Sequence, residues 1–333
     1  MQSRNKASLA YLCALTLLFS YAEMILPRVV PFFRLGLANT EILLALDINF
    51  GSFMILSILK ATAASLIGGT LFSPFFFISL VQSFVSALIM KFLYKFISKK
   101  AISLYGISVV GSAVSAIVQI ILASLYIGKG TFALLGPMLI FNTVSGIVTA
   151  FFSEKSGIKE SISLIENDSQ KIELQIQISE SEKNYRPLVQ IFFAILLIAV
   201  SISIFFIKNL IILAIALVIS LLAQKLSKRK IFILPHISLW LFVFISALFI
   251  PNGKVLFKLW NISVTQGALL IAAQKSLTLS TVSALSQCAV SLKPGKNTLL
   301  GQSLAFYRIM SDRFRKAEGS IIKKINYALN IYF

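Results

Sequence analysis

A small set of polar side chains in the first half of the chain could carry chemistry, because each lies in or beside a strongly apolar run. An unpaired charge in the hydrocarbon of a bilayer costs at least about 2.5–3.5 kcal/mol, so Lys60 needs a partner, and Glu41 or Glu23 could supply it. The side chains are spaced so that they could line one pocket: Arg34, Asn39, Glu41, Lys60, Gln82 and Gln119. Such a pocket suits a small, partly apolar ligand with one or two polar or anionic groups. The alternative is a structural ion pair with Asn and Gln hydrogen bonds between helices.

Aromatic side chains stand near these polar residues and could form the walls of the pocket: Phe32, Phe33, Phe75, Phe76 and Phe77. The motifs of common enzymes are missing. The sequence has no Gly-rich loop followed by Lys-Ser or Lys-Thr, no Ser-centred nucleophile elbow and no Asp-rich motif for Mg²⁺ and diphosphate. His236 is the one histidine, and Cys13 and Cys288 both lie in apolar runs. We therefore expect no catalytic residues, no metal site and no cofactor.

The composition indicates the class of protein that must position these side chains. Hydrophobic residues make up 57% of the 333 residues and charged residues 13%, far from the values of soluble domains. The sequence predicts an all-α polytopic membrane protein with about ten transmembrane helices. The expected spans are 8–26, 36–50, 51–70, 74–94, 101–127, 131–152, 188–207, 209–223, 231–250 and 262–291.

The distribution of Lys and Arg predicts the orientation of these spans. If the N-terminus is inside, 22 Lys and Arg fall in the inside segments and six in the outside segments. This bias favours an orientation with both termini in the cytoplasm. We expect the protein in the inner (cytoplasmic) membrane of the cell. The bias also explains the net charge of +19 without a nucleic-acid partner.

One long polar stretch, 154–186, divides the chain on the cytoplasmic side. We expect a six-helix membrane domain over 1–153, a polar linker over 154–186, and a four-helix membrane domain with a tail over 187–333. The tail, 297–325, has the pattern of a basic amphipathic helix that breaks at Gly319. It could lie on the membrane surface or dock a cytoplasmic partner. In the first span, Ala10 and Ala14 form a small-xxx-small pair that permits close contact between helices.

Three stretches of the first half carry a resemblance: the run Arg-Leu-Gly-Leu-Ala-Asn at 34–39, the run Gly-Thr-Leu-Phe-Ser-Pro at 69–74, and Gly106, Gly111 and Gln119. Residues 7–152 resemble the Gx transporter family, also called heptaprenyl diphosphate synthase component I, which is similar to the substrate-binding S component of energy-coupling factor (ECF) transporters. Ser115 and Ala116 stand where relatives commonly have His and Asn. The resemblance implies a six-helix bundle with an outward-facing pocket, and contact of Ala10 and Ala14 with a T component.

The second half is more faintly similar to that T component, the transmembrane scaffold of the same transporters. The resemblance rests on Gln266-Gly267 to Lys275, on Ser280-Thr281, and on the tail from Phe306 to Gly319. T components couple to ATPase subunits through Ala-Arg-Gly-like triplets. The residues implied in ATPase coupling here are Arg308, Arg315, Ala317, Glu318 and Gly319, with Glu318 in the place of the Arg.

These observations together predict a membrane subunit of an ECF-type importer and not an enzyme. The first half would bind a small vitamin- or precursor-like nutrient, and separate cytoplasmic ATPase subunits would supply energy. The alternative is a non-catalytic membrane accessory component of prenyl (heptaprenyl) diphosphate synthesis.

Overall fold

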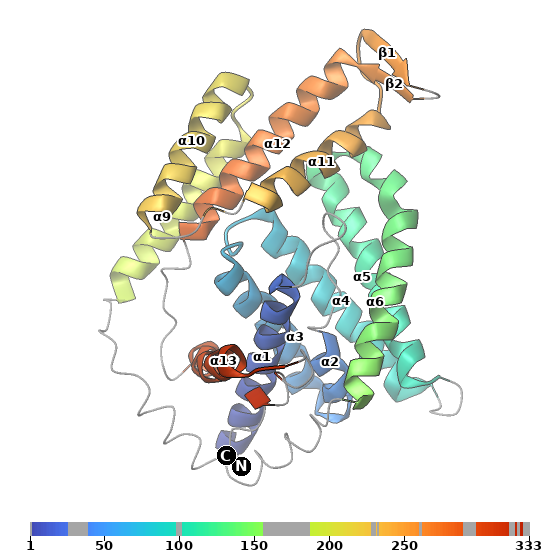
Figure 1. The fold of residues 1–333 in the computed structure, drawn as a ribbon, viewed down its shortest axis with the longest axis vertical. Coiled ribbons are helices and arrows are strands. Elements are labelled where there is room, and N and C mark those ends of the chain that lie inside the picture. Colours follow the sequence, from blue (N-terminus) through green and yellow to red (C-terminus); the bar gives the residue numbers. More distant parts are fainter. Residues whose placement is uncertain are drawn as a thin grey trace.

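The structure is a computed structural model, and it describes residues 2–25, 39–97, 102–155, 187–227, 231, 233–259, 262–288, 298–319, 324, 327 and 328. The described chain is almost entirely helical, as predicted (Figure 1). The first half contains α1 (Gln2–Ile25), α2 (Thr40–Leu44), the 3-10 turn η2 (Ala45–Asp47), α3 (Phe50–Gly68), α4 (Pro74–Phe96), α5 (Leu104–Ile127), the 3-10 turn η3 (Lys129–Leu134) and α6 (Leu135–Lys155). The second half contains α9 (Pro187–Phe205), α10 (Leu210–Leu226), α11 (Ile233–Leu248), β1 (Val255–Leu259), β2 (Ile262–Thr265), α12 (Gln266–Gln287) and α13 (Leu299–Lys316).

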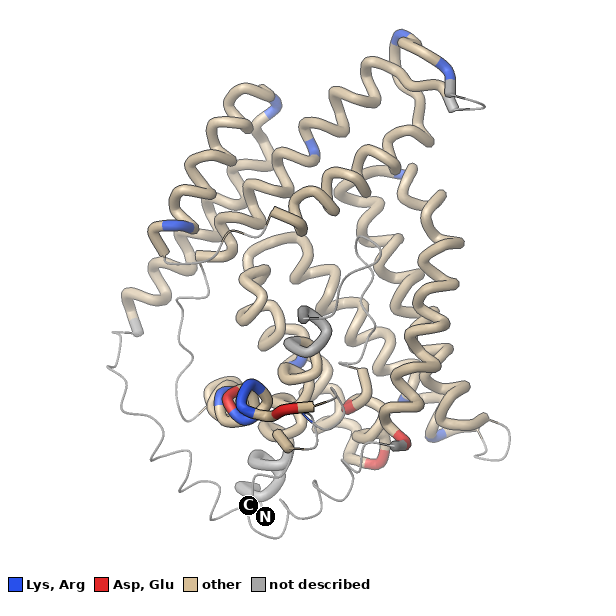
Figure 2. The backbone as a smooth tube through the Cα atoms, viewed as in Figure 1, with Lys and Arg blue, Asp and Glu red and all other residues tan. Residues whose placement is uncertain are grey.

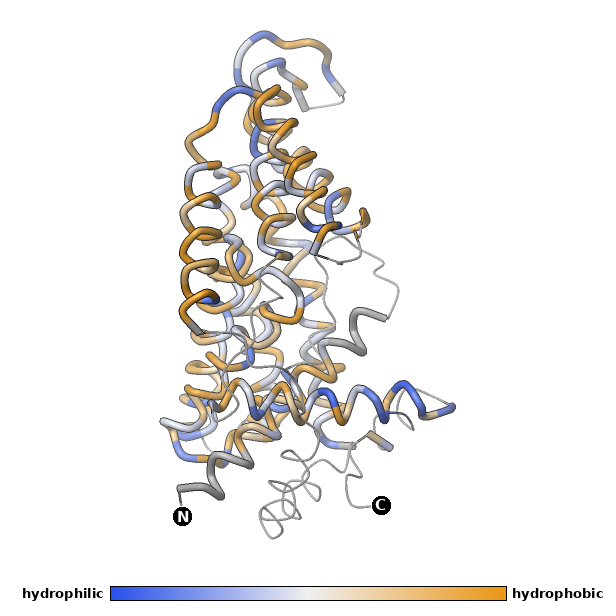
Figure 3. The backbone as a smooth tube through the Cα atoms, turned by 90° about the vertical axis from the view of Figure 1, so that its left-hand side faces the viewer, coloured by the Kyte–Doolittle hydropathy of each residue, from blue (hydrophilic) through white to orange (hydrophobic). Residues whose placement is uncertain are grey.

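The helices have the length and composition of membrane spans. Six helices in the described part of the chain are long and apolar enough to cross a membrane, and three shorter apolar helices accompany them. Large apolar side chains are exposed along α9, α10 and α11, where a soluble protein would have polar ones. Figure 3 shows the hydrophobic residues along the whole length of the upright helices. The protein is therefore a polytopic all-α membrane protein.

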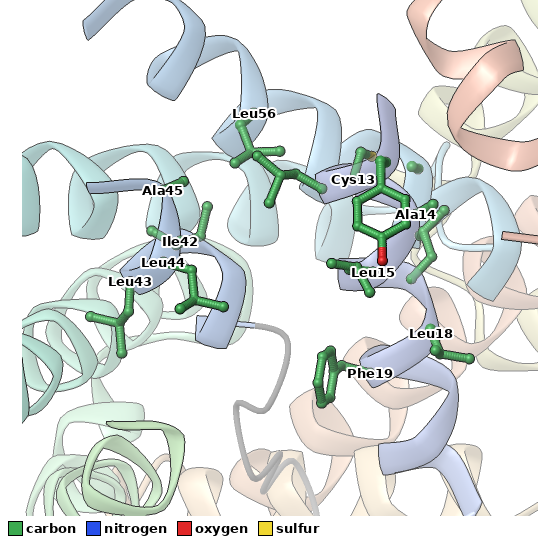
Figure 4. Packing of buried hydrophobic residues seen from close by; sticks show 14 of the residues in the cluster. Cys13, Ala14, Leu15, Leu18, Phe19, Ile42, Leu43, Leu44, Ala45 and Leu56 are labelled. Carbon is green, nitrogen blue, oxygen red and sulfur yellow. The ribbon is translucent and has the colours of Figure 1, made fainter. Parts of the chain in front are cut away.

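The first half packs as a chain of neighbouring helices, with α3 against α4, α4 against α5 and α5 against α6. Its largest core surrounds α1, α2 and α3, and in Figure 4 residues of α2 lie on one side of Leu56 and residues of α1 on the other. Local sequence fixes the ends of these helices. Pro74 begins α4, where its missing N–H is not needed. Gly69 ends α3 with a φ of 68°, a left-handed conformation that glycine adopts without strain.

In the second half α12 is the central helix and packs against α9, α10 and α11. Small residues recur every four positions on its buried face: Ala268, Ala272, Ser276, Ser280 and Ala284. A stripe of small side chains at this spacing lets neighbouring helices approach closely without a hydrophobic driving force. The Trp240 indole N–H of α11 donates a hydrogen bond to the Ser280 hydroxyl at 2.9 Å across this contact.

Two features differ from the sequence prediction. The described part of the expected span 36–50 is α2 and η2, which are five and three residues long and too short to cross a bilayer. The expected span 262–291 begins instead with β2, which pairs with β1 in an antiparallel hairpin before α12 starts at Gln266. The expected linker 154–186 lies almost wholly outside the described residues.

The two halves contact each other at several levels. Near the η3 end, the Lys275 ammonium of α12 donates a hydrogen bond to the Ile127 carbonyl at the end of α5, at 2.5 Å. Gly130 in η3 approaches α11 so closely that a Cβ there would lie 1.9 Å from the Ser246 carbonyl oxygen. At the other end of α12, the Gln287 amide donates to the Gly68 carbonyl at 2.8 Å.

Candidate functional site

A buried polar cluster lies between α1, α2 and α3. Lys60, ten residues into α3, has 9% of its side chain exposed, and its ammonium donates a hydrogen bond to the Asn39 side-chain oxygen. Glu41, in the first turn of α2, is completely buried. It lies close enough to Cys13 of α1 to interact with it electrostatically. Between Asn39 and Glu41, the buried Thr40 hydroxyl has no hydrogen-bond partner among the described residues.

The segment that carries this cluster is fastened to α4. The Lys91 ammonium of α4 donates to the carbonyl oxygens of Leu46 and Ile48, at 2.5 and 2.6 Å. One turn further along α4, the Tyr94 hydroxyl donates a hydrogen bond to the Asp47 carboxylate. These bonds satisfy carbonyls that the short η2 turn leaves without helical partners, and so hold α2 in place. Lys91 and Tyr94 are positioning residues that the sequence reasoning missed; the signal was an ammonium group inside an expected span.

The Lys60–Asn39 pair lies well along α3 from the start of that helix. Because an α-helix rises 1.5 Å per residue, Lys60 lies about 15 Å along α3 from Phe50, and Asn39 is at that depth with it. Asn39 and Glu41 are therefore inside the bundle. The described residues do not form the complete span expected over 36–50. Arg34 and the expected aromatic residues Phe32 and Phe33 lie outside the described residues.

The two glutamines of the predicted pocket lie on other helices than Asn39 and Lys60. Gln82 on α4 and Gln119 on α5 are both half-buried, and no hydrogen bond among the described residues joins either of them to Asn39 or Lys60. The Gln82 side-chain oxygen is buried, and no residue in the described part of the chain donates a hydrogen bond to it.

Two of the aromatic residues expected in the walls have different surroundings. Phe75 packs against a core cluster of the second half that contains Leu239 and Val243. Phe77 is exposed.

The predicted coupling face of α1 is completely buried against the C-terminal helix. Ala10 and Ala14 have no exposed surface. They lie between Tyr11 and Cys13 around the helix. The Tyr11 ring meets the Phe306 ring of α13 edge to face, with centroids 6.0 Å apart, and the Cys13 thiol is within hydrogen-bonding reach of the Ser303 side chain. The small side chains of α1 therefore let α13, from the other half of the same chain, approach closely.

The C-terminal helix lies across the end of the bundle, nearly perpendicular to the upright helices (Figure 3). Thr298 caps its first turn by accepting a hydrogen bond from the Gly301 N–H at 3.1 Å. One face carries the buried residues Phe306, Met310 and Phe314, and the helix ends at Lys316. The amphipathic helix predicted for the tail is thus confirmed for 299–316.

The residues implied in ATPase coupling follow the polar face of α13 and the turn after it. Arg308 and Arg315 are exposed on the helix, and Glu318 and Gly319 are exposed beyond its end. Ala317 is buried. Gly319, the predicted break, has a φ of 103°, a backbone conformation that glycine adopts without strain. Figure 2 shows this cluster of Lys and Arg at the same end of the molecule as the start of α1.

The fold and the buried site define a class, a helical membrane protein whose first half carries a buried polar cluster and whose last helix is basic and lies across one end. The comparisons place the first half more narrowly. Residues 12–156 match the family described as heptaprenyl diphosphate synthase component I. Residues 186–291 match a family described as a domain of unknown function (DUF8519). No curated protein and no solved structure matches the chain.

Proposed function

We propose that this protein is a fused membrane subunit of an ECF-type importer. Residues 1–153 bind a small vitamin- or precursor-like nutrient, and residues 187–333 act as the scaffold that couples to ATPase subunits encoded separately. One observation carries the proposal: a basic amphipathic helix of the second half packs against the small-residue face of α1. This is the contact that the resemblance implies between an S component and its T component.

The packing gives a physical route from α13 to the polar cluster. α13 contacts α1 through the Tyr11–Phe306 ring pair, and α1 in turn packs against α2 and α3, which carry Glu41 and Lys60. All three helices belong to one hydrophobic core. Because close-packed cores transmit displacements, a movement of α13 driven by ATPase subunits would shift the surroundings of the cluster.

The same proposal assigns an orientation and a location. In Figure 1 the start of α1, the ends of α4 and α6, and α13 lie at one end, and the turns between α5 and α6 and between α11 and α12 lie at the other. Among the described residues, the first end carries Lys95 of α4 and the basic residues of α13, all of which belong to sequence segments assigned to the inside. We place this end, with both termini, in the cytoplasm and the protein in the inner membrane.

Association with ATPase subunits tests the proposal. The tagged protein is purified from its host, and co-purifying ABC-type ATPase subunits are quantified by mass spectrometry. Arg308→Glu combined with Arg315→Glu is expected to abolish their recovery, because the exposed basic face becomes acidic. The matched control, Lys129→Glu with Lys208→Glu, reverses two exposed charges at the opposite end and should keep recovery unchanged. Equal recovery from all three proteins would refute the coupling role of α13.

A second experiment tests the binding site independently. Small molecules released from the purified protein are compared by mass spectrometry for the wild type and Lys60→Ala. Loss of a co-purifying compound in the variant places Lys60 in the site. Undiminished recovery of that compound from a folded variant would remove Lys60 from it.

The family description favours one alternative, a non-catalytic accessory role in prenyl diphosphate synthesis. Under that reading, the basic face of α13 would dock a soluble synthase in place of an ATPase. The co-purification experiment distinguishes the two functions. It identifies which protein, an ATPase subunit or a synthase, is recovered with the wild type and is lost from the Arg308→Glu, Arg315→Glu variant. Prenyl-transfer activity in the recovered complex would support the alternative.

A further inference from the structure

The hairpin between α11 and α12 has an inner strand and an outer strand with different surroundings. In β2, Val264 is buried and Thr265 accepts hydrogen bonds from the backbone N–H groups of Asn252 and Ala268, at 2.9 and 3.4 Å. This strand packs against α11 and α12. β1 pairs with β2 on one side only among the described residues, with a bulge between Val255 and Phe257.

The outer strand is apolar and exposed. Val255 is 46%, Leu256 52% and Phe257 56% exposed, so three consecutive apolar side chains have half of their surface uncovered by the protein. Successive side chains of a strand point to opposite faces, and here both faces are apolar. In water this strand would be an aggregation hazard, so its position in the molecule must supply a cover.

Two observations identify that cover. First, exposed apolar side chains occur from α11 up to the hairpin, with Ile237 and Leu241 on the helix and Phe249 and Ile250 between the helix and the hairpin. Since the hairpin joins two apolar helices of the membrane domain, it begins where those helices reach the membrane surface.

Second, the charges at the hairpin have one sign. Lys254 and Lys258 flank the apolar triplet and are exposed, and the sequence from 187 to 311 contains no Asp or Glu. In Figure 2 the blue segments of the hairpin have no red segment near them. Apolar side chains between two ammonium groups match the boundary between acyl chains and anionic headgroups.

We propose that β1 is an interfacial anchor that binds anionic phospholipid. Val255, Leu256 and Phe257 enter the boundary of the acyl chains, and Lys254 and Lys258 contact lipid phosphates. The anchor fixes the depth of α11 and α12 in the membrane. Because Lys275 of α12 is hydrogen-bonded to the end of α5, the anchor also fixes the depth of that end. The anchor does not depend on the importer assignment.

An environment-sensitive fluorophore at Phe257→Cys tests the anchor, in a background with Cys13→Ala and Cys288→Ala. The protein is reconstituted in phosphatidylcholine vesicles with and without phosphatidylglycerol. We expect blue-shifted emission that nitroxide lipids labelled near the headgroup quench, with stronger quenching when phosphatidylglycerol is present. A label at Glu318→Cys, beyond α13, provides the water-exposed reference.

The charge arm uses Lys254→Gln with Lys258→Gln. Each lysine near an anionic surface favours the bound state about fivefold, so the pair accounts for a factor of about 25, and the phosphatidylglycerol effect should disappear. The matched control, Lys95→Gln with Lys316→Gln, should retain it. Water-like emission in both kinds of vesicle would overturn the proposal. So would a phosphatidylglycerol effect that survives loss of both lysines, or a blue shift that depends on protein density, which would mean that a second copy covers β1.

Discussion

Replacing Ala14 by leucine should detach α13 from α1. Ala14 has no exposed surface and lies between the two positions of α1 that meet Ser303 and Phe306, so there is no room for three more carbon atoms. Overpacking of this kind costs about 1–3 kcal/mol. At the α1–α13 contact, this lowers the equilibrium constant for docking by a factor of about 5 to 150.

Disulfide trapping measures the docked fraction directly. With Cys288→Ala and Ser303→Cys in the chain, oxidation can join the native Cys13 thiol to the new thiol on α13, because the two side chains are already within hydrogen-bonding reach. A protease site inserted between residues 157 and 185 then reports the bond. A trapped chain stays at full length on a non-reducing gel after cleavage, and an untrapped chain separates into two fragments.

The expected result is efficient trapping with alanine at position 14 and slow trapping with Ala14→Leu. Ala14→Gly keeps the side chain small and should trap like the parent. Ala214→Leu makes the same enlargement at an exposed position of α10 and should have no effect. If Ala14→Leu traps as fast as the parent, α13 does not pack on this face of α1, and the proposed coupling route fails with it.

Three further predictions concern stability in detergent, measured by thermal unfolding. Gly130→Ala should destabilise the protein by about 1–3 kcal/mol, because the new Cβ would overlap the Ser246 carbonyl. Gly136 has open space around it, so Gly136→Ala should be nearly neutral. Equal effects of the two substitutions would contradict the close approach of η3 to α11. Lys91→Met removes the donor to the Leu46 and Ile48 carbonyls and should cost about 1–3 kcal/mol. An unchanged melting temperature would show that other contacts hold α2 in place. Trp240→Phe removes the hydrogen bond to Ser280 inside the second half and should cost about 0.5–1.5 kcal/mol. Unchanged stability of this variant would contradict a contribution of that hydrogen bond.

The comparison of prediction and structure is most instructive at Asn39 and Lys60. The sequence indicated that Lys60 needs a polar partner, because an ammonium in hydrocarbon is costly. The expected partner is a carboxylate, Glu41 or Glu23, and the structure adds the Asn39 side-chain oxygen as an acceptor for the Lys60 ammonium. Residue type predicts that a buried charge is satisfied, but which neighbour satisfies it depends on the path of the chain between 39 and 60. The short α2 and η2 set that path.

Two other elements show the same division. The basic amphipathic tail was predicted from periodicity alone, because a helix must place its apolar residues on one face whatever it contacts. The β1–β2 hairpin was missed, because nine strand residues beside a long helix give no periodic signal that separates them from the end of a span.

The sequence by itself determined the class of the protein, the amphipathic tail and the small-residue face of α1. It also carried the resemblance of the first half to a known family, which the family match over residues 12–156 supports. These follow from composition and local spacing, which the chain carries in one dimension. Only the tertiary structure decided that α13 covers that face of α1 and that α12 joins the ends of α3 and α5. Contacts between residues more than a hundred positions apart depend on how whole helices pack, and packing is decided by the fit of complete surfaces.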